Sequence, residues 1–255
     1  MKTALITGAS TGLGYEFAKI FASERYDLVI VARNKEKLEN VALQLKTDYG
    51  TNVMVISADM SDYQTAEKIY KEVTKSGIII DTLVNNAGSG NYGFLAESEP
   101  QVAAATINLN VTSLTLLTNY FLKDMVKRRS GKILNVSSLG AFQPDPYFAV
   151  YGATKAYELL FTQSLYGELI GTGVSVSVLC PGPTKTEFAT RSGKKDAGFA
   201  MSARSVAMAG YKGLQKGKLV IIPGFKYKLE VFGIRLLPSK LAARIIRKWQ
   251  KSLKE

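Results

Sequence analysis

The chain has 255 residues, 46% of them hydrophobic, which is enough for one domain with a substantial core. Its lack of histidine and its single cysteine, Cys180, exclude Ser-His-Asp triads, histidine-ligated zinc sites and intrachain disulfides, and favour a reducing, cytoplasmic location. No apolar run reaches the roughly 18 residues that span a bilayer, and most of the net charge of +12 lies in residues 211–255, which hold twelve Lys or Arg and two Asp or Glu.

A glycine-rich turn separates the first predicted strand, residues 2–7, from an amphipathic helix predicted from about residue 13 to 24. Glycines let a backbone approach a pyrophosphate, and the N–H groups at a helix N-terminus favour its negative charge. The spacing is Gly-x-x-x-Gly-x-Gly, not the more usual Gly-x-Gly-x-x-Gly. We interpret the turn as a phosphate cradle, with a purely structural loop as the alternative.

The end of the second predicted strand, residues 27–32, bears on the choice of cofactor. At this position an acidic residue binds the ribose 2′-hydroxyl of NAD, whereas an arginine accommodates the 2′-phosphate of NADP. Ala32 and Arg33 stand here, so the sequence favours NADP(H), with NAD(H) as the alternative. A surface role for Arg33 at the strand end is the structural alternative.

A helix over residues 35–48 and a third strand over 52–57 follow. Asp59 comes just after this strand, where its carboxylate could accept from an adenine amino group, and Ser61 or Asp62 could cap the next helix, which ends near residue 75. A fourth, almost wholly apolar strand is predicted over 78–84, as expected of a sheet covered on both faces. It ends in Asn85-Asn86-Ala87-Gly88, where the amides could satisfy neighbouring strand ends and the small residues leave room for a cofactor.

A long helix predicted over residues 100–127 contains Asn108 and Asn110 among apolar neighbours. Asparagine is a poor helix-interior residue, so two of them on a largely buried helix indicate a polar function. The fifth strand, 132–136, is followed by Ser138. Ligands of parallel sheets bind at the carboxyl ends of the strands, which places Ser138 for chemistry, although a simple cap is the alternative.

Tyr151 and Lys155 are four residues apart on the next predicted helix, which reaches about residue 170, and so they share one helix face. A nearby ammonium favours the phenolate and lowers the pKa of a tyrosine from its free value of about 10. The pair could therefore provide acid–base chemistry in a chain without histidine. A surface tyrosine beside a solvated lysine is the structural alternative.

A sixth strand is predicted over residues 174–179, followed by Cys180 as a packed core thiol and by a Pro-Gly-Pro-Thr turn. Residues 185–200 are polar and small and indicate a lid, and a helix over 202–215 and a seventh strand over 218–222 follow. Five aromatic residues could line an apolar pocket or simply pack under the lid: Phe142, Tyr147, Phe148, Phe188 and Phe199.

Strands and helices alternate throughout, which predicts one doubly wound α/β domain. Thr7–Gly14 (TGASTGLG), Asn85–Gly88 (NNAG), Ser138, Tyr151–Lys155 (YGATK) and Pro181-Gly182 occur in an order and at spacings that resemble the short-chain dehydrogenase/reductase family over nearly the full length. The resemblance implies a Rossmann-type fold whose seven-stranded parallel sheet has the order 3-2-1-4-5-6-7, with helices on both faces. Residues 1–224 would form the dinucleotide-binding and catalytic part, and residues 225–255 a basic amphipathic C-terminal extension of the same domain.

The resemblance also implies an NADP-dependent oxidoreductase that transfers a hydride between the nicotinamide and a carbonyl or alcohol. By motif position, Tyr151 resembles the general acid/base, Lys155 its pKa-lowering, ribose-binding partner, Ser138 the residue that polarises the carbonyl, and Asn110 the holder of a relay water, with Asn108 as the competing choice. Thr11 departs from family variants with a basic residue in the glycine loop, so the NADP prediction rests on Arg33. The cofactor-binding residues expected are Gly8, Ser10, Thr11, Gly12, Leu13, Gly14, Arg33, Asp59, Met60, Asn86, Ala87, Gly88, Tyr151, Lys155, Pro181, Gly182 and Thr184, and no metal is expected.

The C-terminal tail leaves several interpretations open. Residues 225–253 alternate apolar side chains with Lys and Arg and end in a predicted helix on which Leu241, Ile245, Ile246 and Trp249 face one way. Such a helix suits peripheral contact with a membrane, or packing on the domain or on a second subunit, and the family resemblance implies a homodimer or homotetramer. No nucleic-acid reader motif accompanies the charge, so nucleic acid is not an expected partner.

Two functions are therefore compatible with the sequence. The first is the oxidoreductase, acting on an apolar or lipid-like substrate. The second is a non-catalytic, nucleotide-sensing protein on the same fold that acts through its basic tail. The joint presence of Tyr151, Lys155, Ser138 and Asn110 favours the enzyme, because a sensor needs no proton relay.

Overall fold

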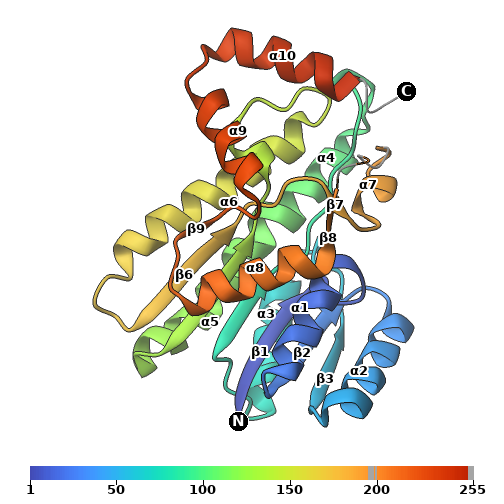
Figure 1. The fold of residues 1–255 in the computed structure, drawn as a ribbon. Helices are drawn as coiled ribbons and strands as arrows, with labels where there is room; N and C mark the ends of the chain where they lie inside the picture. Colours follow the sequence, from blue (N-terminus) through green and yellow to red (C-terminus); the bar gives the residue numbers. More distant parts are fainter. Residues whose placement is uncertain (195–197, 199, 252–255) are drawn as a thin grey trace.

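A parallel seven-stranded sheet between two layers of helices organises the chain (Figure 1). The computed structural model describes residues 1–194, 198 and 200–251. The strands of the main sheet are β1 (Lys2–Thr7), β2 (Tyr26–Ala32), β3 (Val53–Ser57), β4 (Thr82–Asn85), β5 (Gly131–Val136), β6 (Val174–Leu179) and β9 (Val220–Ile221). Their order is β3-β2-β1-β4-β5-β6-β9, which confirms the predicted fold and order, with β9 as the seventh strand.

The helices that cover the sheet alternate with these strands along the chain. They are α1 (Gly12–Ser23), α2 (Lys35–Tyr49), α3 (Thr65–Lys75), α4 (Pro100–Ile107), α5 (Leu114–Arg128), α6 (Ala149–Glu168) and α8 (Ala203–Gln215). A short helix, α7 (Phe188–Arg191), and a two-stranded sheet of β7 (Thr184–Lys185) and β8 (Met201–Ser202) lie in the segment after β6.

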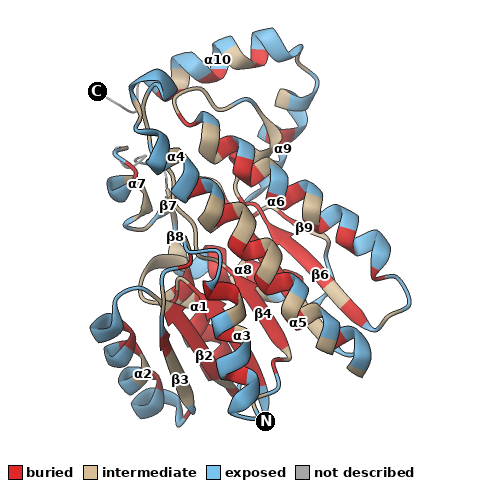
Figure 2. Cartoon of the chain, turned by 180° about the vertical axis from the view of Figure 1, so that it is seen from behind, coloured by how far each residue is buried: buried red, intermediate tan, exposed pale blue. Residues whose placement is uncertain are grey.

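The period of two along β1 divides the core between the two faces of the sheet. Ala4 and Ile6 pack with side chains of α1, α2 and α8, whereas Leu5 packs with side chains of α3, α5 and α6. All three residues are fully buried, and the strands of the sheet are the most continuously buried part of the molecule (Figure 2). Two-sided burial explains why the central strands are nearly continuous apolar runs.

Two predicted strands are shorter in the structure. The fourth strand was expected over 78–84, but β4 begins at Thr82, because the Asp81 carboxylate accepts the Thr3 N–H at 2.8 Å and ladder pairing starts with Ala4 opposite Thr82. Ile79 is 58% exposed. The seventh strand was expected over 218–222 but is only β9, Val220–Ile221.

The helix expected over 100–127 is also not one regular helix. It runs as α4, then a π-helical turn η2 (Asn108–Ser113), then α5, so both predicted asparagines lie in the irregular turn. π-Turns within helices are rare and often occur at functional sites. Asp62, expected as a cap, accepts the Gln64 N–H at 2.9 Å one residue before α3 begins, and so closes the turn that leads into the helix.

The C-terminal helices α9 (Phe225–Arg235) and α10 (Ser239–Lys251) lie at the end of the molecule toward which the strands point, opposite the N-terminus (Figure 1). Tyr227 and Val231 of α9 pack against Leu139, and Ile246 of α10 is buried. The expectation that Leu241, Ile245, Ile246 and Trp249 share one face is wrong, because Leu241 and Ile245 are exposed while Ile246 is buried. None of the helices within the described ranges has the length and apolar character that crossing a bilayer requires.

Candidate functional site

A cavity of about 690 Å³ opens at the carboxyl ends of β1, β4, β5 and β6. This size is ordinary for a cofactor or small-molecule site, and the position follows the rule for ligands of parallel α/β sheets. Most of the predicted site residues line its wall: Gly8, Ser10, Thr11, Gly12, Leu13, Arg33, Asp59, Met60, Asn86, Ala87, Gly88, Ser138, Tyr151, Lys155, Pro181, Gly182 and Thr184. Two predicted residues, Gly14 and Asn110, lie behind the wall.

The glycine-rich turn between β1 and α1 forms one end of the cavity. Gly8 and Gly12 have φ angles of +67° and +58°, which side-chain-bearing residues rarely adopt. Gly14 has a different function: a Cβ there would lie 2.1 Å from the Gly8 carbonyl oxygen, so only glycine lets α1 start this close to the turn. The first turn of α1 is thereby held at the cavity wall, and its N-terminal N–H groups with the helix dipole favour an anion.

Cationic and polar side chains from the ends of β2 and β3 surround this end of the cavity. Arg33 and Lys37 both line the wall, and Arg33 is exposed. The Asp59 carboxylate accepts from the N–H of Ser61 at 2.9 Å and from its hydroxyl at 2.8 Å. Met60 is buried and its carbonyl accepts from the Ser113 hydroxyl in η2. The π-turn thus contacts the loop that follows β3.

The end of β4 is fastened to the end of β1 by hydrogen bonds. The Asn86 side-chain amide donates to the carbonyls of Thr7 at 2.9 Å and Gly8 at 3.3 Å, and the Thr7 hydroxyl accepts the N–H groups of Asn86 and Ala87. Asn85, by contrast, donates into the core, to Thr118 and Asn135, both at 2.9 Å. The prediction that the asparagine amides satisfy neighbouring strand ends is thus confirmed for Asn86, whereas the Asn85 amide bonds two buried side chains.

Asn110 is fully buried and links three elements. Its Oδ1 accepts the Ser89 N–H at 3.0 Å, and its Nδ2 donates to the Ser89 carbonyl and to the Thr154 hydroxyl, both at 2.9 Å. The bonds tie the loop after β4 to α6 at the residue before Lys155. Asn108, the competing candidate, is only half-buried.

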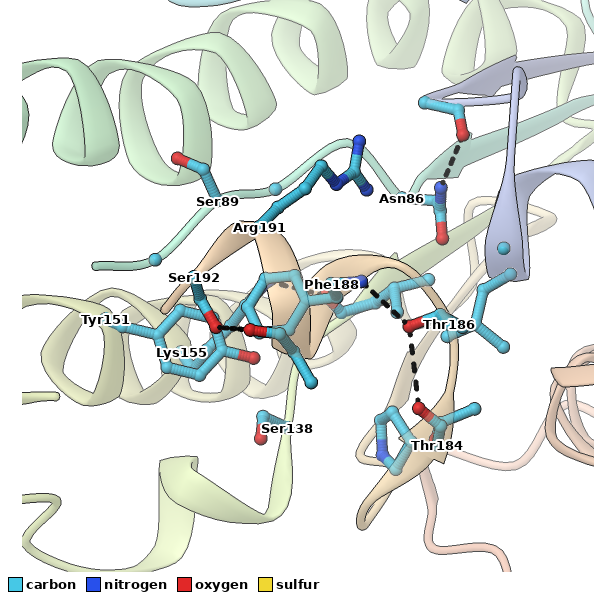
Figure 3. A pocket seen from close by; sticks show the side chains of 18 of the residues that line it. Asn86, Ser89, Ser138, Tyr151, Lys155, Thr184, Thr186, Phe188, Arg191 and Ser192 are labelled. Atoms are coloured by element: carbon cyan, nitrogen blue, oxygen red, sulfur yellow. Dashed lines mark hydrogen bonds between the residues drawn. The ribbon is translucent and has the colours of Figure 1, made fainter. Parts of the chain in front are cut away.

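Tyr151 of α6 and Ser138, which follows β5, both line the inner part of the cavity (Figure 3). Burial raises the pKa of the Tyr151 phenol well above its ordinary value; a hydrogen bond with Ser138 lowers it in part, and the charges of Glu158 and Asp145 raise it further. The Ser138 hydroxyl also accepts the Gly140 N–H at 3.1 Å. The direction of this pKa shift is opposite to the one expected from the Tyr-Lys pair alone.

Burial is the largest cause of the raised Tyr151 pKa, and the Lys155 ammonium, which was expected to oppose it, is instead held in a buried ion pair with Glu158, a residue that the sequence did not predict at the site. The Lys155 Nζ donates to both carboxylate oxygens of Glu158, at 2.8 and 3.0 Å, and to the Val136 carbonyl at 2.9 Å. All three N–H bonds of the ammonium are thus directed at these groups, while its nitrogen lies 5.6 Å from the centre of the Tyr151 ring. Burial raises the pKa of Glu158, and Lys155 only partly offsets this.

Aromatic rings enclose Tyr151. The ring centres of Phe148 and Phe188 lie 4.9 and 5.3 Å from that of Tyr151, and Figure 3 includes Phe188 among the side chains around the cavity. A Cβ at Gly90 would lie 2.9 Å from the Tyr151 ring, so this glycine makes room for it. Phe199, also predicted to line the pocket, lies outside the described residues. Tyr147 is not among the described residues that line the cavity.

The outer wall of the cavity comes from the C-terminal helices. Trp249 and Gln250 of α10 line it, with Tyr227 of α9. The Gln250 side-chain amide donates to Asp145, and the Gln250 carbonyl accepts from the Tyr92 hydroxyl at 2.6 Å. Burial raises the pKa of Asp145 to about 6, although Gln250 and Lys194 act in the opposite direction.

Comparison with known proteins gives three concordant results. A family model described as short chain dehydrogenase matches residues 2–197. An uncharacterised oxidoreductase of Staphylococcus epidermidis is 34% identical over 185 residues, which cover 72% of this chain and 79% of that protein. The very-long-chain 3-oxoacyl-CoA reductase of Anas platyrhynchos is 33% identical over 184 residues, 70% of this chain and 58% of that protein.

Among solved structures, a short-chain dehydrogenase from Sphingobium yanoikuyae in complex with NADPH is similar to this chain, with a TM-score of 0.85. The sequences are 31% identical, and the match covers 91% of this chain and 92% of the other. The match therefore extends over nearly the whole of both chains.

Proposed function

We propose that this chain, which belongs to the short-chain dehydrogenase/reductase family, is an NADP(H)-dependent oxidoreductase that interconverts a carbonyl and an alcohol. The observation that carries the proposal is the pairing of Tyr151 and Ser138 in a cavity whose opposite end is a glycine cradle. A single cavity thus combines an anion-binding end with a proton-donating end.

The residues of the cavity fit a dinucleotide. Gly8, Gly12 and the first turn of α1 would hold its pyrophosphate, since the backbone there is open to an anion. Arg33 would hold a 2′-phosphate, because it is a cation on the wall directly after β2, where an NAD-binding site would present an acidic residue. Lys37, in the first turn of α2 and 4.0 Å from Glu187, is a second cation on this wall. Lys155 would reach a ribose hydroxyl only by giving up one of its present hydrogen bonds.

When bound, the nicotinamide supplies or accepts the hydride. Tyr151 then exchanges a proton at the substrate oxygen, and Ser138 donates a second hydrogen bond to the same oxygen as negative charge develops there. The raised pKa keeps the Tyr151 phenol protonated, the form that carbonyl reduction requires. Asn110 fixes the loop at Ser89 and the helix at Thr154 on either side of this point.

The test of this function is NADPH oxidation against ketones, aldehydes, quinones, steroids and 3-oxoacyl thioesters. With the substrate so found, Tyr151→Phe should lower turnover by about 10²- to 10⁴-fold while NADPH binding, measured by its fluorescence, persists. Tyr157→Phe is the matched control, because Tyr157 lies on the same helix with its hydroxyl 2.9 Å from Thr115. Wild-type reduction by Tyr151→Phe would disprove the role of the phenol.

The preference for NADP has its own test. Arg33→Ala should raise the dissociation constant for NADPH by roughly tenfold, the equivalent of a charge-assisted hydrogen bond, and leave that for NADH nearly unchanged. Lys35→Ala is a suitable control, because Lys35 pairs with Glu39 at 3.7 Å and does not line the cavity within the described residues. Equal losses for the two cofactors would contradict a 2′-phosphate site at Arg33.

An apolar or lipid-like substrate suits the aromatic enclosure of Phe148, Phe188, Tyr227 and Trp249. The Anas platyrhynchos relative, a very-long-chain 3-oxoacyl-CoA reductase by name, is consistent with this class. The non-catalytic alternative is not favoured, since the named relatives are oxidoreductases. If the protein bound NADPH but turned over no substrate of the panel, the non-catalytic alternative would be favoured instead.

A further inference from the structure

The outer face of α9 is apolar although it is not packed on the domain. Phe225, Leu229, Phe232 and Leu236 are 73%, 57%, 66% and 70% exposed. At 3.6 residues per turn, these four positions fall within about 60° of one another around the helix axis. Tyr227 and Val231, which are buried, occupy the opposite side. The helix therefore has two apolar faces, whereas a helix on the surface of a soluble domain needs one.

The next helix also exposes apolar side chains. Only residues 236–238 separate α9 from α10, and α10 exposes Leu241 and Ile245 while Ile246 packs inward. Residues 225–251 contain one acidic residue, Glu230, and eight basic ones: Lys226, Lys228, Arg235, Lys240, Arg244, Arg247, Lys248 and Lys251, all of them exposed. We name the six exposed apolar residues, five from the two helices and Leu236 from the link between them, together with these cations other than Lys226, which lines the cavity, the C-terminal surface.

We propose that the C-terminal surface docks on the interface of an anionic lipid bilayer. Apolar side chains on this surface would enter the boundary between headgroups and acyl chains, and the surrounding Lys and Arg would contact anionic headgroups. Each basic residue near such a surface adds to this attraction, which salt weakens. A second copy of this chain is a poorer occupant, since an isologous contact would bring two equally cationic surfaces together.

The same helices form the outer wall of the cavity. Tyr227 of α9 and Gln250 of α10 are buried and line this wall, and Lys226 and Trp249 line it as well. Docking would therefore leave the inner contacts of both helices in place and bring the cavity close to the bilayer. The docking proposal does not depend on the reaction, because it concerns only the outward side chains.

Co-flotation of the full chain with vesicles tests the proposal. We expect the protein to float with phosphatidylcholine vesicles that contain phosphatidylserine, to float several-fold less with phosphatidylcholine alone, and to be released by high salt. Phe232→Glu should lower the bound fraction roughly tenfold, because one large apolar side chain is lost from the interface. Leu43→Glu makes a similar change at an exposed position of α2, 66% accessible, and should float like the wild type.

Flotation needs neither cofactor nor substrate. A negative flotation result would therefore contradict the docking proposal without bearing on the proposed reaction. Circular dichroism would verify that both variants are folded. The proposal is overturned if the wild type fails to float with the anionic vesicles at low salt, or if Phe232→Glu and Leu43→Glu float equally well. If light scattering instead finds an oligomer that Phe232→Glu dissociates, and no flotation, a second copy covers the surface and the proposal is likewise wrong.

Discussion

At the scale of single residues, the ion pair of Lys155 and Glu158 changes the interpretation of the Tyr-x-x-x-Lys motif. The sequence correctly placed Tyr151 and Lys155 on one helix, and i,i+3 spacing also brings Glu158 within reach of Lys155. The motif does not specify how far the pair is buried or which way the ammonium turns. Both depend on the packing of α6 against β5, where the Val136 carbonyl takes the third N–H bond.

The pair leads to a prediction about stability. Glu158→Leu alone should lower the free energy of unfolding by about 3–5 kcal/mol, because it leaves the Lys155 ammonium buried without a counter-ion. Adding Lys155→Met should restore most of the loss, since two apolar side chains of similar volume replace the pair. Urea unfolding of the wild type, the two single variants and the double variant measures the coupling; purely additive losses would show that the two charges are energetically independent.

At the scale of elements, the close approach of α1 to the end of β1 depends on one glycine. A Cβ on Gly14 would lie 2.1 Å from the Gly8 oxygen and 2.6 Å from Asn86 Nδ2, both held by the hydrogen bonds that join β1 and β4. Gly14→Ala should therefore destabilise the protein by about 3 kcal/mol or more, through overpacking against the backbone.

Gly167→Ala in α6 is the matched control for this prediction. Among the described residues, no heavy atom outside its own helix lies within 4 Å of the position that a Gly167 Cβ would take. Alanine is the better helix former by about 0.5–1 kcal/mol, so this variant should be as stable as the wild type or more so. Thermal unfolding compares the two variants, and a similar loss in both would contradict the steric argument.

The elements also show where sequence patterns succeed and where they end. The bounds of β1 and β6 were predicted correctly. β1 has an apolar centre that is buried on both faces, β6 alternates Val with Ser before Leu179, and turn residues follow both strands. The start of β4 was not predicted correctly, because Ile78–Ile80 are as apolar as a strand and only the tertiary bond between Thr3 and Asp81 excludes them. The π-turn was not predicted, and the sequence feature that marks its position is the pair of asparagines, which a regular helix disfavours.

At the scale of the whole molecule, the topology rule for parallel sheets accounts for the predicted cavity wall. Residues at the carboxyl ends of β1, β2, β4, β5 and β6 come together there because of the strand topology, independently of their side-chain types. Asp145 and Gln250 line the cavity but were not predicted as site residues. They are 105 residues apart in the sequence and come into contact only because α10 packs against the loop that holds Asp145. Sequence patterns of one helix cannot specify which distant loop it covers.

The packing of α10 against the rest of the molecule completes the cavity wall. Two adjacent isoleucines of α10 lie on its different faces, one buried and one exposed. Ile246 is 6% exposed and Ile245 is 46% exposed. Ile246→Asp would bury a carboxylate among apolar side chains, so α10 should undock more often than in the wild type. Losing the burial of one isoleucine, about 2–2.7 kcal/mol, raises the undocked population roughly 30- to 100-fold.

Trypsin measures that population, because α10 carries cleavage sites at Arg244 and Arg247, and cleavage of a transiently opened segment tracks how often it opens. Ile246→Asp should be cut in α10 about 30- to 100-fold faster than the wild type, and Ile245→Asp should be cut at nearly the wild-type rate. The control places the same carboxylate beside Arg244, so an effect of the charge on trypsin itself would appear there first. Equal rates for the two variants would mean that the inner face of α10 does not hold the helix against the cavity.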